Sequence, residues 1–346
     1  MNNVLVTGGC GFIGSNFVKH LIFCGNYFPV ILDKLTYAGN IANLDQVDKN
    51  KYILIKGDIC DLELVNDLFK KYKFKGIFNF AAESHVDRSI DGPKEFIQTN
   101  IFGTFNLLES SRNYFKNINS DFKFIHISTD EVYGDLGKDG FFKESSPYKP
   151  NSPYSASKAA SDHLTKAWGH TYELPVIITN CSNNYGPFQF PEKLIPLIII
   201  NCLEWKSLPI YGDGKNERDW LFVTDHCQSL EIIFRKGKIG ETYNIGGNNV
   251  VKNIDIVKTI CDVLDKLKPS GKGSYRELIS YVKDRPGHDR RYAIDSQKIY
   301  EELNWKPKES FSSGIKNTIK WYINNESWWR DIKKSNYSQK RLGVNT

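Results

Sequence analysis

Two clusters of side chains in the first half of the chain could carry out chemistry, and the first is Tyr154 with Lys158. They are four residues apart, so on a helix they lie on one face, one turn from each other. A phenol with a pKa near ~10 is a poor base at neutral pH, but a nearby ammonium group favours its phenolate form. Such a pair is typical of enzymes that move a hydride, with the phenol handling the hydroxyl proton.

The second cluster is Thr129-Asp130-Glu131. Two neighbouring carboxylates do not ionise equally, so the pKa of one tends to rise, which suits a division into one acid and one base. Neighbouring side chains on a strand face opposite ways, so both acids can reach one substrate only if the strand ends before Asp130. Gly134 indicates such a turn. Hydride transfer together with two proton-moving acids indicates elimination of water from an activated sugar.

A glycine turn after the first apolar run predicts a dinucleotide site. Gly8, Gly11 and Gly14 directly precede an amphipathic segment, where a helix N-terminus could present free N–H groups to a pyrophosphate. Asp33 follows about 20 residues after Gly14, where a carboxylate accepts hydrogen bonds from ribose hydroxyls and repels a 2′-phosphate. This favours NAD over NADP, although Lys34 beside it weakens the preference.

The ends of two further apolar runs are also expected to contact the cofactor, because open α/β sheets bind ligands at the carboxyl ends of their strands. Asp58 and Ile59 would flank the adenine, and small residues after the fourth run would let the backbone pass close by. That second group is Phe80, Ala81, Ala82, Glu83 and Ser84.

The elements that must position these residues alternate along the chain. Short apolar runs predict buried parallel strands at 4–6, 30–32, 52–55, 77–80, 124–127 and 176–178. Amphipathic segments between them predict helices at 12–23, 62–71, 95–112 and 154–172. We therefore expect an α/β protein with a Rossmann-type doubly wound parallel sheet over 1–186, to which some later segments return. Shorter elements indicate a smaller α/β substrate-binding domain over 187–330 and a loosely held tail over 331–346.

Composition is ordinary for a globular protein of 346 residues, with 40% hydrophobic and 25% charged residues. The seven scattered cysteines form no CxxC pair and predict neither a metal site nor disulfides. No apolar run is long enough to span a bilayer and no secretory signal is visible, so we expect a cytoplasmic protein without membrane contact. The net charge of +6 lacks a basic block, which favours an anionic small molecule over nucleic acid.

Nine segments in order resemble the extended short-chain dehydrogenase/reductases of the NAD-dependent epimerase/dehydratase type, most closely the branch that dehydrates dTDP-glucose. The resemblance covers roughly residues 3–325. The segments are 8–14 (GGCGFIG), 33–40 (DKLTYAGN), 81–89 (AAESHVDRS), 128–135 (STDEVYGD), 154–158 (YSASK), 180–187 (NCSNNYGP), 190–196 (FPEKLIP), 218–220 (RDW) and 284–292 (DRPGHDRRY).

The resemblance implies conversion of dTDP-glucose to dTDP-4-dehydro-6-deoxyglucose and water, in dTDP-rhamnose synthesis, with NAD recycled in place. Tyr154 would remove the C4 hydroxyl proton while Thr129 holds that hydroxyl. Glu131 would take the C5 proton, and Asp130 would donate to the leaving C6 hydroxyl. Further cofactor contacts implied are Phe12, Ile13, Lys34, Leu35, Thr36, Thr99, Asn184 and Lys158.

The resemblance also implies a nucleotide-sugar site and a homodimer through the helices around 95–112 and 154–172. Arginines and lysines there would bind the diphosphate, for which the arginine fork is well shaped. The implied substrate contacts are Ser84, Thr129, Asn183, Lys193, Leu194, Pro209, Ile210, Tyr211, Arg218, Asn253, Asp284, Arg285 and His288.

Three other functions share this scaffold. A 4-epimerase needs only the Tyr154–Lys158 pair, and a nucleotide-glucuronate decarboxylase has no use for an acid at Asp130. A catalytically silent NAD-binding regulator would not need Thr129, Asp130 and Glu131 intact. The dehydratase reaction is the one that uses both acids.

Overall fold

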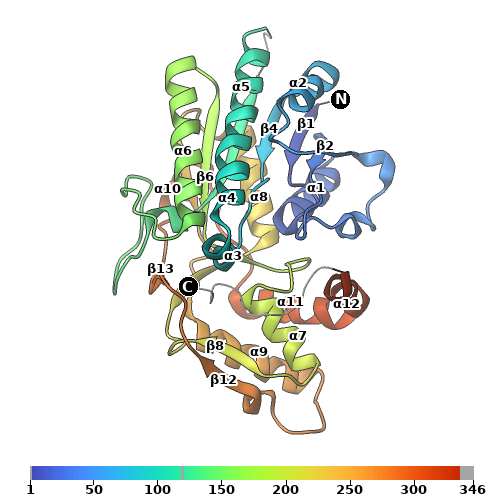
Figure 1. Cartoon of the computed structure of the whole chain (residues 1–346), viewed down its shortest axis with the longest axis vertical. Coiled ribbons are helices and arrows are strands. Elements are labelled where there is room, and N and C mark those ends of the chain that lie inside the picture. The colour runs from blue at the N-terminus through green and yellow to red at the C-terminus, as the bar shows by residue number, and fades with distance from the viewer. Residues whose placement is uncertain (1, 118–120, 336–346) are drawn as a thin grey trace.

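A seven-stranded parallel sheet forms the centre of the larger part of the molecule (Figure 1). The computed structural model describes residues 2–117 and 121–335. The strand order is β10-β6-β5-β4-β1-β2-β3, so the winding direction reverses between β1 and β4, and the predicted doubly wound, Rossmann-type sheet is confirmed. Its strands are β1 Asn3–Thr7, β2 Phe28–Asp33, β3 Ile53–Lys56, β4 Gly76–Asn79, β5 Lys123–Thr129, β6 Val176–Cys181 and β10 Thr242–Ile245.

Helices cover both faces of this sheet. On one face α1 (Phe12–Cys24), α8 (Val223–Lys236) and α10 (Gln297–Leu303) pack together over an apolar core. On the other face α2 (Leu62–Tyr72), α5 (Thr104–Phe115) and α6 (Pro153–Tyr172) cover a second cluster of buried side chains. The inner strands are therefore buried on both sides, which explains why most of them appear in the sequence as continuous apolar runs.

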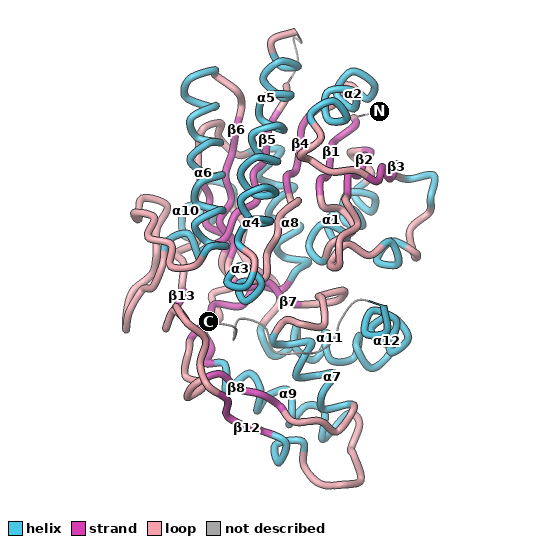
Figure 2. Tube along the Cα trace, viewed as in Figure 1, coloured by secondary structure: helices cyan, strands magenta, loops and turns pink. Residues whose placement is uncertain are grey.

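A smaller part with its own apolar core lies below the main sheet in Figures 1 and 2. It contains short paired strands, among which β9 pairs with β7, β11 and β13, while β8 pairs with β12. Its elements are β7 Asn183–Tyr185, α7 Leu194–Leu203, β8 Leu208–Tyr211, β9 Glu217–Phe222, β11 Val250–Lys252, α9 Asn253–Leu267, η5 Tyr275–Leu278, β12 Ile279–Val282, β13 Arg291–Tyr292, α11 Phe311–Asn324 and α12 Glu326–Ser335.

Three segments differ in detail from the prediction. The expected helix over 95–112 is interrupted: α4 (Pro93–Phe96) leads into the π-helical turn η3 (Ile97–Gly103) before α5 begins. A short helix that was not predicted, α3 (Val86–Asp91), precedes them. Two short 3-10 helices, η1 (Ile41–Leu44) and η2 (Lys49–Lys51), follow β2.

The beginning of the predicted tail is ordered, so the expectation of a loose segment is wrong for 331–335. These residues are the last part of α12, where Ile332 is buried and Lys333 pairs with Glu204 at 2.6 Å. The burial of Ile332 and the ion pair of Lys333 hold this turn in place, and neither is visible in its basic composition. The remainder of that prediction, 336–346, lies outside the described residues. Within the ranges that are described, no helix is long and apolar enough to cross a membrane.

Candidate active site

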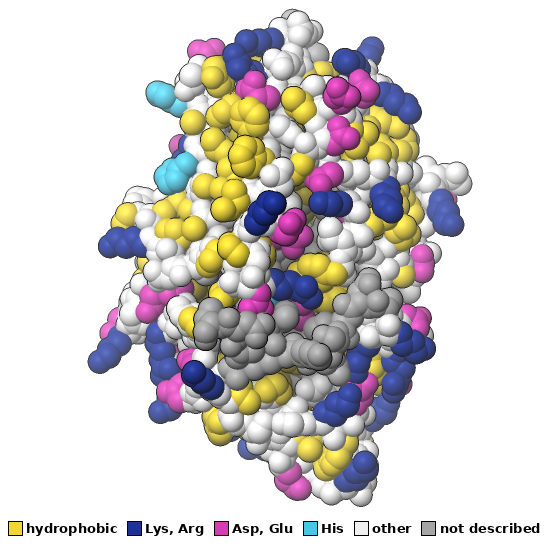
Figure 3. All heavy atoms as spheres, viewed as in Figure 1, with side chains coloured by type: hydrophobic (Ala, Val, Ile, Leu, Met, Phe, Trp, Pro, Cys, Tyr) yellow, Lys and Arg dark blue, Asp and Glu magenta, His cyan; other side chains and the backbone are white. Residues whose placement is uncertain are grey.

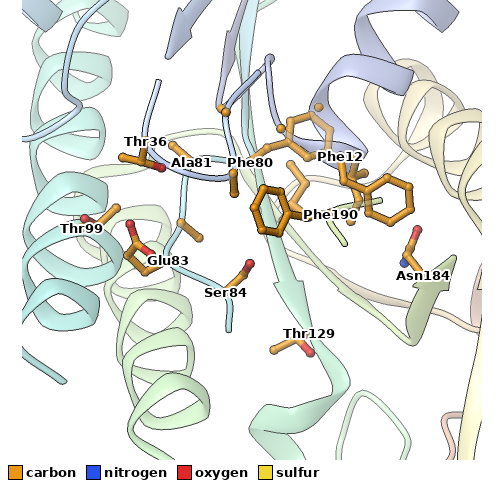
Figure 4. Close-up of a pocket in the computed structure, with 18 of the residues that line it drawn as sticks. Phe12, Thr36, Phe80, Ala81, Glu83, Ser84, Thr99, Thr129, Asn184 and Phe190 are labelled. Atoms are coloured by element: carbon orange, nitrogen blue, oxygen red, sulfur yellow. The ribbon is translucent and has the colours of Figure 1, made fainter. Parts of the chain in front are cut away.

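A cavity lies at the carboxyl end of the main sheet, where the winding direction reverses. Figure 4 shows side chains from different elements gathered around it, among them Phe12 of α1, Ser84 after β4, Thr129 at the end of β5 and Asn184 of β7. Every residue predicted to contact the cofactor lines this cavity except Leu35. The predicted cofactor and catalytic residues are therefore brought together in space.

The glycine turn closes tightly at the start of α1. Gly8 has a φ of +68°, and a Cβ built on Gly14 would lie 2.2 Å from the carbonyl oxygen of Gly8, so only glycine fits there. Gly11 is the N-cap of α1 and, in the described chain, no side chain caps the first-turn N–H groups. These groups border the cavity and are suited to a pyrophosphate, so the turn fits NAD.

Asp33 is the last residue of β2, as predicted. Its carboxylate accepts hydrogen bonds from the backbone N–H groups of Leu35 and Cys10, both at 2.8 Å. Leu35 has a φ of 56° and its side chain packs against the apolar core beneath α1, which explains why it does not reach the cavity. The Lys34 ammonium pairs with Asp58 at 2.7 Å. Because this charge is matched by a carboxylate, it does not oppose the preference of Asp33 for an unphosphorylated ribose.

The boundary of β5 places both acids at the cavity. The strand ends at Thr129, two residues later than predicted, and the 3-10 helix η4 (Asp130–Tyr133) begins at once. The required end of the strand before Asp130 is thus confirmed. The Thr129 hydroxyl accepts the N–H of Glu131 at 3.3 Å and donates to Asp130 Oδ1 at 3.3 Å. One threonine therefore fixes the turn that directs both carboxyl groups to the cavity.

The two acids have different electrostatic surroundings. Asp130 is buried, and within the described part of the chain its Oδ2 atom has no hydrogen-bond partner. Burial raises the pKa of Asp130 well above its usual value, and the carboxylates of Glu131 and Asp219 raise it further. Burial also raises the pKa of Glu131, but Arg285, foremost among nearby cations, acts against this rise. Asp130 is thus suited to hold a proton and Glu131 to accept one.

Tyr154 and Lys158 face the cavity from α6, as their spacing predicts. The Lys158 ammonium donates to the carbonyl oxygen of Ile127 at 2.8 Å, at the end of β5. Burial raises the pKa of Tyr154 well above its usual value, and the Glu131 carboxylate raises it further. In the chain by itself Lys158 does not offset these effects, so a phenolate at Tyr154 needs an additional positive charge in the cavity.

The predicted substrate residues divide into two groups. Ser84, Thr129, Asn183 and Lys193 line the cavity, and the Lys193 ammonium donates to the carbonyl oxygen of Ser84 at 3.0 Å. The others do not line it, and Ile210 is buried in the core of the smaller part. They are Leu194, Pro209, Ile210, Tyr211, Arg218, Asn253, Asp284, Arg285 and His288.

Two members of this outer group, Arg285 and Tyr211, are joined by hydrogen bonds through Asp87, and a third, Arg218, is held by Asp289. Asp87 accepts from the Arg285 guanidinium at 2.9 Å and from the Tyr211 hydroxyl at 3.2 Å. The Arg218 guanidinium donates to the backbone carbonyl of Asp289 at 2.9 Å. The result is a cluster of positive charge close enough to Glu131 to influence its pKa, although it lies outside the cavity wall.

The cavity also contains residues that the sequence analysis did not select. Most of them lie inside the segments that carry the family resemblance. They could have been predicted from the sequence if every residue of those segments had been considered. Leu32, Gly57, Ile127 and Gln189 lie outside those segments. The full set is Leu32, Tyr37, Ala38, Gly39, Gly57, Ile127, Ser128, Cys181, Ser182, Gln189, Phe190 and Glu192.

The doubly wound sheet, the glycine turn and the Tyr154–Lys158 pair at one cavity define an enzyme of the extended short-chain dehydrogenase/reductase class. The family model described as GDP-mannose 4,6 dehydratase matches residues 5–318, and the chain belongs to this family.

Within this family, the chain is similar to curated and structurally characterised dTDP-glucose 4,6-dehydratases. The chain is 54% identical to a dTDP-glucose 4,6-dehydratase of Neisseria meningitidis serogroup B, over 99% of both chains. It is 55% identical to dTDP-glucose 4,6-dehydratase 1 of Escherichia coli K12, over 96% of both. A dTDP-glucose 4,6-dehydratase of Streptomyces venezuelae, solved with NAD bound, superposes with a TM-score of 0.88 at 43% identity, covering 96% of this chain and 100% of that one.

Proposed function

We propose that this chain is an NAD-dependent hydro-lyase that converts dTDP-glucose to dTDP-4-dehydro-6-deoxyglucose and water. The observation that carries the proposal is the pair Asp130 and Glu131 at the end of β5, on the same cavity as Tyr154 and the glycine turn. An epimerase or a decarboxylase would not need both acids. The curated relatives, which are 54–55% identical, support the same reaction.

The chain's own residues supply the proton steps. Tyr154 accepts the C4 hydroxyl proton, Glu131 removes the C5 proton after the C4 ketone has acidified it, and Asp130 donates its proton to the departing C6 hydroxyl, which leaves as water. A proton then returns to C5. The cavity residues Gly11, Asp33 and Lys158 would hold NAD, which would supply the hydride acceptor for C4 and the hydride donor for C6.

The raised pKa values agree with these roles. Asp130 must enter the elimination protonated, and its burial favours that form. Tyr154 must lose its proton to act as a base; the positive charge of the oxidised cofactor together with Lys158 would favour that loss. We assign Lys158 a second role in holding the nicotinamide ribose.

The substrate side requires groups for a nucleoside diphosphate. In this proposal residues 1–186 hold the cofactor, 187–330 hold the nucleotide sugar, and β10 returns to the main sheet. Lys193, Arg218 and Arg285 provide positive charge next to Glu131 and are assigned to the diphosphate and sugar. The preference for thymidine over uridine rests on the relatives. The same resemblance supports a role for the reaction in dTDP-rhamnose synthesis.

The direct test is incubation of the purified protein with dTDP-glucose, followed by the alkali-induced absorbance of the keto product. We expect turnover with dTDP-glucose and weaker turnover with UDP-glucose at equal concentration. Absence of the keto product with both nucleotides would overturn the proposed function. Formation of dTDP-galactose instead would indicate an epimerase.

We further propose that the protein is a cytoplasmic homodimer. All seven cysteines are free, which agrees with a reducing compartment. Figure 3 shows hydrophobic side chains gathered over α5 and α6. The exposed large hydrophobic residues of η3, α5 and α6 are Ile97, Phe102, Phe105 and Tyr172, with exposed fractions of 37–54%. A patch of this kind is typical of a subunit interface.

A further inference from the structure

A partly buried cluster of four side chains connects the two parts of the molecule at the cavity, and the proposed reaction does not use it. Tyr37 comes from the loop after β2, Arg88 from α3, and Phe190 and Glu192 from the segment between β7 and α7. Tyr37, Phe190 and Glu192 line the cavity. The cluster therefore joins loops of the cofactor-binding part to the segment that leads into the smaller part.

The contacts within the cluster are numerous. The Arg88 guanidinium donates from Nε and Nη2 to Glu192 Oε2, at 3.1 and 3.0 Å. Its guanidinium carbon lies 3.8 Å from the centre of the Tyr37 ring. The Tyr37 ring meets the Phe190 ring edge-on, with the ring centres 5.4 Å apart. Burial raises the pKa of Tyr37 most, and the Glu192 carboxylate is close enough to raise it further. Each of the four side chains contacts at least one other that comes from a different loop.

Burial makes these contacts strong. The Glu192 side chain is 3% exposed and that of Arg88 is 29% exposed, so the ion pair is largely shielded from water and salt. Removing one member of a buried pair leaves the other charge without compensation, which costs far more than losing a surface pair. The stacking of the Arg88 guanidinium on the Tyr37 ring adds a cation–π contact, which is stronger where water is excluded.

A second contact continues from the same segment. The backbone N–H of Lys193 donates to the carbonyl of Phe190 at 3.1 Å, which fixes the turn. The Lys193 ammonium then donates to the carbonyl of Ser84, in the loop after β4. The segment 190–193 is thus attached at two points to loops that are expected to contact NAD, and it forms the opposite wall of the cavity.

We propose that Tyr37, Arg88 and Glu192 form a latch that holds the segment 190–193 against the cofactor-binding loops and so retains NAD between turnovers. This inference rests on the proposed function, in which the cofactor is regenerated in every cycle and has no need to leave. The three side chains are positioning residues, because they act by keeping the cavity wall closed. Release of NAD requires this wall to separate, and the latch opposes that separation.

The test measures loss of NAD from the purified holoenzyme after dilution, with released NAD captured by an NAD-consuming reporter enzyme. We expect Arg88→Met and Glu192→Gln each to speed NAD release at least tenfold. The double variant should release NAD no faster than the more severe single variant, because either change alone breaks the same pair. Arg88→Lys keeps the charge and loses the forked guanidinium. Its rate of NAD release should lie between that of Arg88→Met and that of the wild type. Turnover at saturating NAD should decrease by a smaller factor than release increases.

Arg276→Met is the matched control. Arg276 forms a two-point pair with Asp262, at 2.5 Å for both contacts, between η5 and α9. Its NAD release should equal that of the wild type. If the latch variants do not fold, Tyr37→Leu, which removes the stacking and leaves the ion pair, should still speed release.

Unchanged NAD release in the folded variants, or an equal increase in Arg276→Met, would overturn the latch. Because release is measured without sugar, the result is independent of the outcome with dTDP-glucose. A protein that turned over neither nucleotide sugar could still confirm or refute the latch.

Discussion

Asp130 and Glu131 are neighbours in the chain, yet their surroundings assign them opposite roles. Asp130 Oδ1 accepts a hydrogen bond from the Thr129 hydroxyl. Its Oδ2 atom is buried and has no hydrogen-bond partner among the residues described. Glu131 faces the cations of the smaller part, led by Arg285. A proton is therefore favoured on Asp130 and less favoured on Glu131. This difference produces an acid and a base from two adjacent carboxyl groups.

Replacing Asp130 by Asn should separate the two halves of the reaction. The amide cannot donate a proton with the ease of a carboxylic acid, so elimination should slow by about 10²- to 10⁴-fold. Oxidation at C4 does not involve Asp130 and should persist. Single-turnover absorbance of the reduced nicotinamide checks this: the signal should rise at a near-normal rate and then remain. Tyr154→Phe is the comparison, in which the rise itself should be lost; equal loss of both steps in Asp130→Asn would contradict the assignment.

The raised pKa of Asp130 also predicts how stability depends on pH. The folded protein binds this proton more tightly than the unfolded chain, whose carboxyl pKa is about 3.9. The stability that this carboxyl group contributes is therefore fully present below about pH 4. It is lost as the pH rises through the pKa of the group in the folded protein. Asp130→Asn removes this pH dependence. The melting temperature of the variant minus that of the wild type should therefore be more positive at about pH 8 than at about pH 5. A pH-independent difference would show that Asp130 keeps an ordinary pKa.

Single residues could be predicted from the sequence wherever a short motif contains them. Asp130, Glu131, Tyr154 and Lys158 each belong to a run of three to five residues whose spacing determines a shared face or turn. The pairing of Lys34 with Asp58 could not be predicted, because the two residues follow different strands and meet only in the assembled sheet. The same holds for Arg88 with Glu192, which are separated by 104 positions.

At the scale of elements, strand ends and turns determine where chemistry is possible. The sequence predicted that β5 must end before Asp130, and the structure ends it at Thr129, where the threonine hydroxyl caps η4. The interruption at η3 was not predictable, because a π turn depends on how the helix packs. A Cβ built on Gly103 would lie 2.4 Å from the Ile59 side chain, so the helix is closely packed against the loop after β3 at this point.

The glycine turn gives a prediction at this scale. In Gly14→Ala the new methyl group would meet backbone, with the Gly8 carbonyl oxygen at 2.2 Å, so the turn and the start of α1 must move apart. We expect a loss of about 1–3 kcal/mol in the free energy of unfolding and weaker NAD binding. Denaturant unfolding and NAD titration measure the two effects.

Gly92→Ala is the control, because its Cβ would meet nothing closer than 3.9 Å and its φ is −148°. It should remain within about 0.5 kcal/mol of wild type. If Gly14→Ala behaves like Gly92→Ala, the close packing of the turn is not what selects glycine there.

At the scale of the whole molecule, most of the main sheet could be predicted, whereas the strand pairing inside the smaller part could not. Six strands of the main sheet carry apolar runs that are visible in the sequence without knowledge of their neighbours, whereas β10, which alternates Thr242, Tyr243, Asn244 and Ile245, carries none. The smaller part depends on short strands paired across large separations, such as β13 with β9 and β12 with β8. Most of the assigned substrate residues occur there, and two of them, Arg285 and Arg218, meet Asp87 and Asp289 only in the folded chain.

The exposed apolar patch on η3, α5 and α6 gives the last prediction. Phe102 is 54% exposed and lies in the interrupted helix of this patch. If two copies bury the patch against each other, Phe102→Glu places a charge in an apolar interface. The change should weaken the dimer by about 2 kcal/mol or more, which is about 30-fold in the dissociation constant. Sedimentation velocity across a dilution series should show a dimer for wild type and a shift toward monomer for the variant, with an unchanged circular dichroism spectrum. Phe23→Glu is the control, because Phe23 is 91% exposed on α1, on the opposite face of the sheet from the patch. An equal shift toward monomer in both variants, or a monomeric wild type, would rule out this interface.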